Sequence, residues 1–228
     1  MKKQAIIASL RRDLHAVIAA RTSINATTLA SARIALRRFQ MARLARTHAD
    51  LLAARETRAA AQFFLEDLYG VNDCARRDAD IERVVPIMER VLPTLALRYI
   101  AEAIELDCQS ELLDCEMAAL LGEQFDEQDY IRAYRTVQNR AAREAQLAHI
   151  DSVGKSLCQL VHMPMMGASI AAMTIPAKLA QLSELHHFLQ RGFSAFKKMP
   201  QPEEFVATIV RRETVILDRL YAGLPDPF

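Results

Sequence analysis

The stretch that decides the fold is residues 93–121, PTLALRYIAEAIELDCQSELLDCEMAALL. After Pro93 it contains no proline or glycine, and alanine and straight-chain residues dominate it, which favours a helix. At about 100° per residue, its apolar side chains fall on two roughly opposite faces. The first face holds Leu95, Tyr99, Leu106, Leu113, Met117 and Leu121, and the second holds Leu97, Ile104, Cys108 and Cys115. Such a helix has to pack between two layers of a bundle, or between its own bundle and a second subunit.

Two polar stripes separate these apolar faces. One stripe holds Arg98, Glu102, Glu105, Gln109 and Glu116, and the other holds Asp107, Glu111 and Asp114. We expect these acids to emerge along the seams between the packed layers and to pair with arginines from other helices.

The rest of the chain also favours helices. Its 228 residues include only six glycines and no tryptophan, and no segment alternates apolar and polar residues as a strand does. We expect helices over 3–21, over about 40 residues from Thr27 to Leu68 because no proline or glycine interrupts them, over 126–149, over 176–199 and from 202 to near Gly223. Asp78 is expected to cap a short helix, with Pro86 and Pro93 dividing the chain after it.

The predicted fold is therefore all-α. We expect a single-domain multi-helix bundle over 1–228, with one long N-terminal helix and a central helix that is apolar on two faces. Within it, residues 1–62 form a basic helical N-terminal part, and residues 63–228 form the core of the bundle.

Charge is strongly segregated along the chain. Residues 1–62 carry 12 Lys or Arg and 3 Asp or Glu, whereas residues 63–130 carry 5 and 17. Either the basic part binds an anionic polymer or a membrane surface, or basic and acidic helices pair within the chain or across a dimer. The arginines follow no single stripe and no aromatic residues are interleaved with them. This pattern argues against nucleic acid as the partner.

Residues 156–177 carry no formal charge. The stretch is long enough to cross a bilayer, but Pro164, Gly167 and Pro176 interrupt it, which argues against a membrane span. We expect two short buried helical segments joined near Met163–Gly167. Its methionines are expected to pack against neighbouring helices, with a pocket for a long apolar ligand as the alternative. The apolar patch near the N-terminus is too short for a signal peptide, so we expect a cytoplasmic location.

Carboxylates and one histidine suggest a metal site as an alternative. Di-iron and di-manganese bundles use two Glu-x-x-His pairs and two further glutamates. Here Glu184 and His187 form one such pair, and Glu66, Glu102 and Glu105 could supply oxygens, but a second pair is missing. His186 is adjacent to His187 and points about 100° away on a helix, so we expect one of the two to be partly buried and the other exposed.

Several segments resemble a known family. The motif FFLEDLYG at 63–70, followed by RDADIERVVP at 77–86, is similar to a family of uncharacterised proteobacterial helical proteins, a domain of unknown function. FLQRGF at 188–193 and TIVRRE at 208–213 support the resemblance. The resemblance implies a helical domain and no catalytic residue. The residues themselves suggest a corner that could hold an anion beside an aromatic ring, formed by Tyr69, Arg76, Arg77, Asp78 and Arg83.

These observations lead to one functional hypothesis and two alternatives. The sequence predicts a non-enzymatic interaction or scaffold protein that acts as a homodimer, binds no cofactor, and could also bind a different protein partner. The alternatives are a carboxylate-bridged di-iron or di-manganese oxidoreductase, and binding of an anionic polymer or membrane surface through the basic N-terminal helices. No catalytic residue is assigned.

Overall fold

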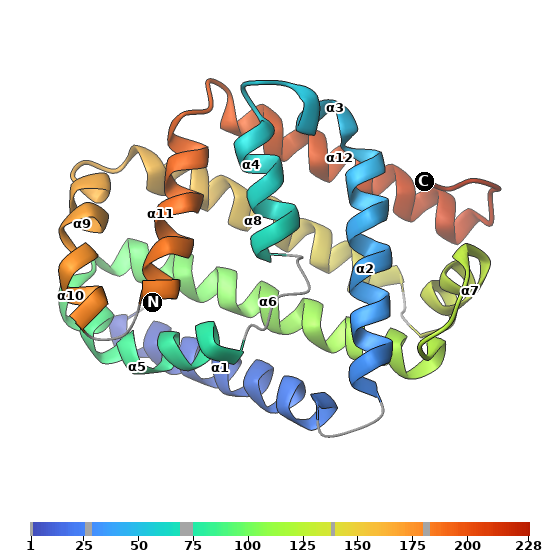
Figure 1. Cartoon of the computed structure of the whole chain (residues 1–228), viewed down its shortest axis with the longest axis horizontal. Helices are drawn as coiled ribbons and strands as arrows, with labels where there is room; N and C mark the ends of the chain where they lie inside the picture. The colour runs from blue at the N-terminus through green and yellow to red at the C-terminus, as the bar shows by residue number, and fades with distance from the viewer. Residues whose placement is uncertain (1, 26–28, 69–74, 138–139, 180–182) are drawn as a thin grey trace.

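The computed structural model describes residues 2–25, 29–68, 75–137, 140–179 and 183–228 (Figure 1). No strand occurs in these ranges, which confirms the all-α prediction. The helices are α1 (Lys3–Asn25), α2 (Leu29–Thr47), α3 (Ala49–Ala53), α4 (Arg58–Phe63), the π-helical turn η1 (Phe64–Leu68), α5 (Ala75–Val91), α6 (Thr94–Leu121), α7 (Glu127–Val137), α8 (Arg140–His162), α9 (Met166–Ala172), α10 (Thr174–Leu179), α11 (Ser183–Lys197) and α12 (Pro202–Ala222).

Helix α6 is the central element, as the sequence predicts. It begins after Pro93 and ends at Gly122, whose φ of 68° suits a residue without a side chain. Figure 1 shows α6 crossing the middle of the molecule, with α1 on one side and α8 and α12 on the other. The helix is therefore packed between two layers.

Both apolar faces of α6 are buried. Leu97, Ile104 and Cys108 of the second face join a core cluster with Ile6, Ile7, Leu10, Leu14 and Val17 of α1. On the first face, Met117 packs with side chains of α2 and α7, and the Tyr99 hydroxyl donates a hydrogen bond to Gln159 of α8. The burial is not uniform, because Leu106, Leu113, Cys115 and Leu121 are partly buried and Leu95, at the start of the first face, is exposed. The two-faced character of the central helix is confirmed.

The long helix expected to reach Leu68 is interrupted, so this prediction was wrong. Helix α2 ends at Thr47, and a turn at residues 54–57 separates α3 from α4. Two side chains donate hydrogen bonds to the carbonyl groups at the end of α3: Thr57 Oγ1 donates to the carbonyl of Leu51, and Arg58 donates to those of Leu52 and Ala53. A turn without proline or glycine is stable here because these donors replace the lost helical hydrogen bonds.

Three further boundaries differ from the sequence prediction. Pro86 lies inside α5 rather than dividing it, and it is exposed. The helix expected over 126–149 is two helices, α7 and α8, and the one expected over 176–199 is α10 and α11. The residues between these pairs, 138–139 and 180–182, lie outside the described residues. The last helix, α12, ends before Gly223 at φ 74°, as expected.

The uncharged stretch is divided where the sequence predicts. Helix α8 ends at His162, residues 163–165 form a turn, and α9 follows. Within the described ranges, no helix is both long enough and apolar enough to cross a bilayer. The prediction that both segments are buried was wrong, because no residue of α9 is buried.

Candidate functional site

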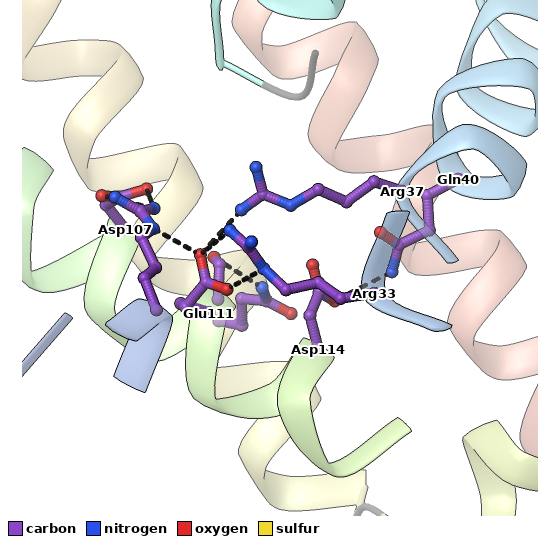
Figure 2. Close-up of polar contacts among 9 residues, drawn as sticks. Arg33, Arg37, Gln40, Asp107, Glu111 and Asp114 are labelled. Atoms are coloured by element: carbon purple, nitrogen blue, oxygen red, sulfur yellow. Dashed lines mark hydrogen bonds and ion pairs between the residues drawn. The ribbon is translucent and has the colours of Figure 1, made fainter. Parts of the chain in front are cut away.

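The centre of the molecule holds a buried ionic cluster, formed by Arg21, Arg33, Arg37, Asp107 and Glu111 (Figure 2). Glu111 is only 1% exposed. Its carboxylate accepts hydrogen bonds from Arg21 Nε at 2.7 Å, from Arg33 Nε at 2.5 Å and from Arg37 Nη2 at 2.7 Å. A single carboxylate is thus shared by three guanidinium groups in the interior.

Helical spacing brings these side chains together. Arg33 and Arg37 lie one turn apart on α2, and Asp107 and Glu111 lie one turn apart on α6, so each pair shares one helix face. Figure 2 shows the two α2 arginines extending toward Glu111. Arg21, near the end of α1, reaches both acids, because its Nη2 donates to Asp107 at 2.9 and 3.0 Å. The cluster therefore fastens α1 and α2 to α6.

The arginines keep Glu111 ionised. Burial disfavours the charged form, but the positive charges of Arg37, Arg21 and Arg33 outweigh it and hold the pKa of Glu111 below its ordinary value. Asp114, one turn further along α6, behaves differently. Burial raises its pKa, against a 2.9 Å hydrogen bond from Gln40 Nε2 and the charge of Arg143.

A second buried ionic contact fastens the other end of α2. Arg43 Nη1 donates to both carboxylate oxygens of Glu213 on α12 at 2.6 Å, and His48 Nε2 lies 3.1 Å from one of them. Arg43, His48 and the Glu213 side chain are largely buried. Burial opposes ionisation of Glu213, but Arg43 and His48 outweigh it and lower the pKa of Glu213.

Part of the segregated charge is used in ion pairs within the chain. Arg21, Arg33, Arg37 and Arg43, all from the basic part, pair with acids of the same chain. The expected pairing of acids with surplus arginines is confirmed. The expected position at the seams was wrong for Glu111, because three arginines together compensate the loss of water around one carboxylate. Glu105 and Glu116, in the other stripe, are exposed.

The predicted metal ligands are not seen as a cluster. Glu102 accepts a 2.9 Å hydrogen bond from Ser156, Glu105 is exposed, and Glu66 lies in η1. His187 is exposed beside Arg191, which lines the same hollow of about 310 Å³ and would repel a metal cation. The described residues contain no group of three or more His, Cys, Asp or Glu placed to hold a metal ion. The side chain of Glu184 lies outside the described part, so the metal site stays a prediction.

Most side chains of the predicted anion corner lie outside the described part of the structure. Tyr69 and the side chains of Arg76, Arg77 and Asp78 lie outside the described residues. The exposed Arg83 has its Nη1 at 3.5 Å from Asp80 Oδ1. This corner also stays a prediction.

The expectation for the adjacent histidines is confirmed. His186 is buried and His187 is exposed. His186 Nε2 donates to the carbonyl of Ile170 at 2.8 Å, and this contact holds α9 against α11.

Sequence reasoning missed an exposed apolar surface at one end of the molecule. We call it the α9–α10 surface; it comprises Met165, Ala168, Ala171, Ala172, Met173 and Ile175, all of which are exposed. Met165 is 78% exposed, Ile175 72% and Met173 44%. Figure 1 places α9 and α10 at the edge of the bundle, beside α11.

A signal for this exposure was present in the sequence. Helix α9 reads MGASIAA, so Met166 and Ile170 are its only large apolar side chains. These two are partly buried, while Ala168, Ser169, Ala171 and Ala172 are exposed. Two large side chains cannot bury a helix on both sides, and the lack of charge was wrongly taken as a sign of burial.

Comparison with known proteins gives one match. The model of a family described as a domain of unknown function (DUF8198) matches residues 19–227. No curated protein and no solved structure matches the chain.

Proposed function

We propose that this chain, which belongs to the DUF8198 family of domains of unknown function, is a non-enzymatic interaction protein that acts as a homodimer. The observation that carries the proposal is the exposure of Met165, Met173 and Ile175 on the α9–α10 surface. Contiguous apolar surfaces on folded proteins mark sites of interaction, whereas single exposed apolar residues need no explanation.

The energy of burial supports this proposal. Covering a fully exposed Met or Ile side chain contributes roughly 1.5–3 kcal/mol. Two nearly fully exposed side chains and the half-exposed Met173 therefore give a partner several kilocalories per mole of favourable contact. Methionine suits such a surface because its flexible thioether side chain adapts to the partner.

The buried ionic cluster supports an architectural role for the charged interior. Glu111 is enclosed and already accepts hydrogen bonds from three arginines, and its lowered pKa makes it a poor proton donor or acceptor near neutral pH. Its clearest effect is to fix α1 and α2 on α6. The surface, rather than the centre, is then the part that meets another molecule.

The test is the mass of the full chain in solution. Light scattering after size-exclusion chromatography at micromolar concentration should give twice the monomer mass of 25.6 kDa. An apolar contact should persist in 1 M salt, whereas contact through charges should weaken, because exposed charges are screened. A mass of one chain at every concentration tested would contradict the homodimer.

A further inference from the structure

We infer that the homodimer forms by contact of the α9–α10 surface with the same surface of a second copy, with α9 against α9 around a two-fold axis. This inference rests on the proposed function and names its interface. The occupant is a second copy of this chain, and the shape, the charge and the support of the surface each favour it.

The order of small and large side chains on the surface suits contact with a second copy. Ala168, Ala171 and Ala172 form a low strip along α9, and an opposing helix can approach such a strip closely. Large side chains stand at the two ends of the strip, Met165 before α9 and Met173 and Ile175 after it. A two-fold axis through the strip makes the two α9 helices antiparallel. Met165 of one copy then lies over Met173 and Ile175 of the other, so each large side chain meets another apolar group.

The charge distribution favours a second copy over a membrane or an acidic protein as the partner. In a two-fold interface, a charged residue near the axis faces the same residue of the other copy and is repelled by it. Residues 156–177 carry no formal charge, so this surface is suited to self-association. An anionic lipid surface is recognised by clusters of bases. The bases that border this stretch in sequence are Lys155 and Lys178, and Lys155 forms a 2.6 Å ion pair with Asp151.

The surface is held in place before any partner binds. The buried His186 anchors the carbonyl of Ile170, and Gly167 lets the ring of Phe193 come so close that a Cβ there would lie 3.1 Å from it. Ala177 of α10 is buried against Val84 of α5. Because α9 and α10 are fixed on α5 and α11, little conformational entropy is lost on association.

The first experiment places a charge on the surface of the full chain. Ile175→Glu and Met165→Glu should each weaken dimerisation at least about tenfold, which corresponds to about 1.4 kcal/mol, in sedimentation equilibrium. The matched control is Val215→Glu, because Val215 is 51% exposed on α12, away from the surface. Circular dichroism should show that all three variants stay helical.

The outcomes separate the interface from the dimer itself. If the unchanged chain is a dimer and both surface variants remain dimers as tight as Val215→Glu, the interface lies elsewhere and this inference is wrong, while the proposed function stands. If the unchanged chain is a monomer, the homodimer and its interface are both wrong. Binding of the monomer to vesicles containing phosphatidylserine, lost in Ile175→Glu, would assign the surface to lipid and overturn the inference.

A second experiment tests the geometry directly. A cysteine close to a two-fold axis forms a disulfide with its own copy, so Ala171→Cys should cross-link under mild oxidation, and the cross-linked fraction should exceed that of the unchanged chain several-fold. Ala119→Cys is the control, since Ala119 is also exposed but lies on α6. Equal cross-linking of the two variants would rule out the packing of α9 on α9.

Discussion

The centre and the edge of this molecule reverse the usual distribution of polar and apolar groups. Glu111 and its three arginines lie in the interior, where apolar side chains are the rule, whereas Met165 and Ile175 face water. Buried charge and exposed apolar surface are the informative departures from normal burial. Each has its own explanation here, because the buried charges satisfy one another, while no described part of the chain covers the exposed side chains of the surface.

The difference teaches how charge relates to depth. Glu111 and Glu116 are both glutamates on polar stripes of α6, but Glu111 is buried and Glu116 is exposed. The burial of Glu111 comes from α1 and α2, whose Arg21, Arg33 and Arg37 form ion pairs with it.

The largest effect is expected at Glu111. Glu111→Gln keeps the volume but leaves three arginines without their shared charge, so the free energy of unfolding should fall by about 3–5 kcal/mol. The control Glu116→Gln, on the exposed stripe of the same helix, should change it by no more than about 0.5 kcal/mol. Urea denaturation measures both. Equal stability of the two variants would show that the cluster does not stabilise the fold.

A smaller effect is expected for one arginine. Arg37→Met removes one charged hydrogen bond to Glu111 and should lower the free energy of unfolding by about 1.5–3 kcal/mol, since Arg21 and Arg33 still hold the carboxylate. The neighbouring Arg38 is exposed, so Arg38→Met is the matched control.

A double-mutant cycle then tests whether Arg37 acts through Glu111. In the Glu111→Gln background, Arg37→Met should lower the free energy of unfolding by less than it does in the unchanged chain, because the carboxylate that Arg37 pairs with is absent. Full additivity of the two changes would contradict a shared cluster.

Acid should weaken the centre of the molecule in a predictable direction. The pKa values of Glu111 and Glu213 are lower in the folded chain than the ordinary value of about 4.3. A carboxyl group with a lowered folded pKa contributes stability above its unfolded pKa, and this stability is lost as the pH falls below about 5. We therefore expect the free energy of unfolding to decline more steeply between about pH 5 and pH 3 in the unchanged chain than in Glu111→Gln. Parallel curves would show that Glu111 is not the group responsible.

The central helix can be predicted from the sequence because the residues that define it are close together in the chain. Pro93, Gly122 and the two apolar faces between them define α6, and the opposed charges of the first two segments predict ion pairs with it. The burial of Glu111 could not be predicted, because it depends on three arginines from two other helices meeting at one point.

The errors also have local causes. The turn at residues 54–57 is stabilised by hydrogen bonds from Thr57 and Arg58 to carbonyl groups five or six residues earlier, and no proline or glycine in the sequence marks it. The exposure of α9 was misjudged because the lack of charge was taken as evidence of burial, although an interface with a partner favours the same composition.

The smallest effect on the single chain is expected at the edge. Ile175→Ser, measured by urea denaturation at a concentration low enough to keep the chain monomeric, should change the free energy of unfolding by no more than about 0.5 kcal/mol, because the side chain is already in water. At high concentration the unchanged chain should gain stability and the variant should not, since association stabilises only the folded state. A large loss of stability in the monomeric variant would mean that Ile175 packs within its own chain. The edge would then be part of the core, and the contrast with Glu111 would disappear.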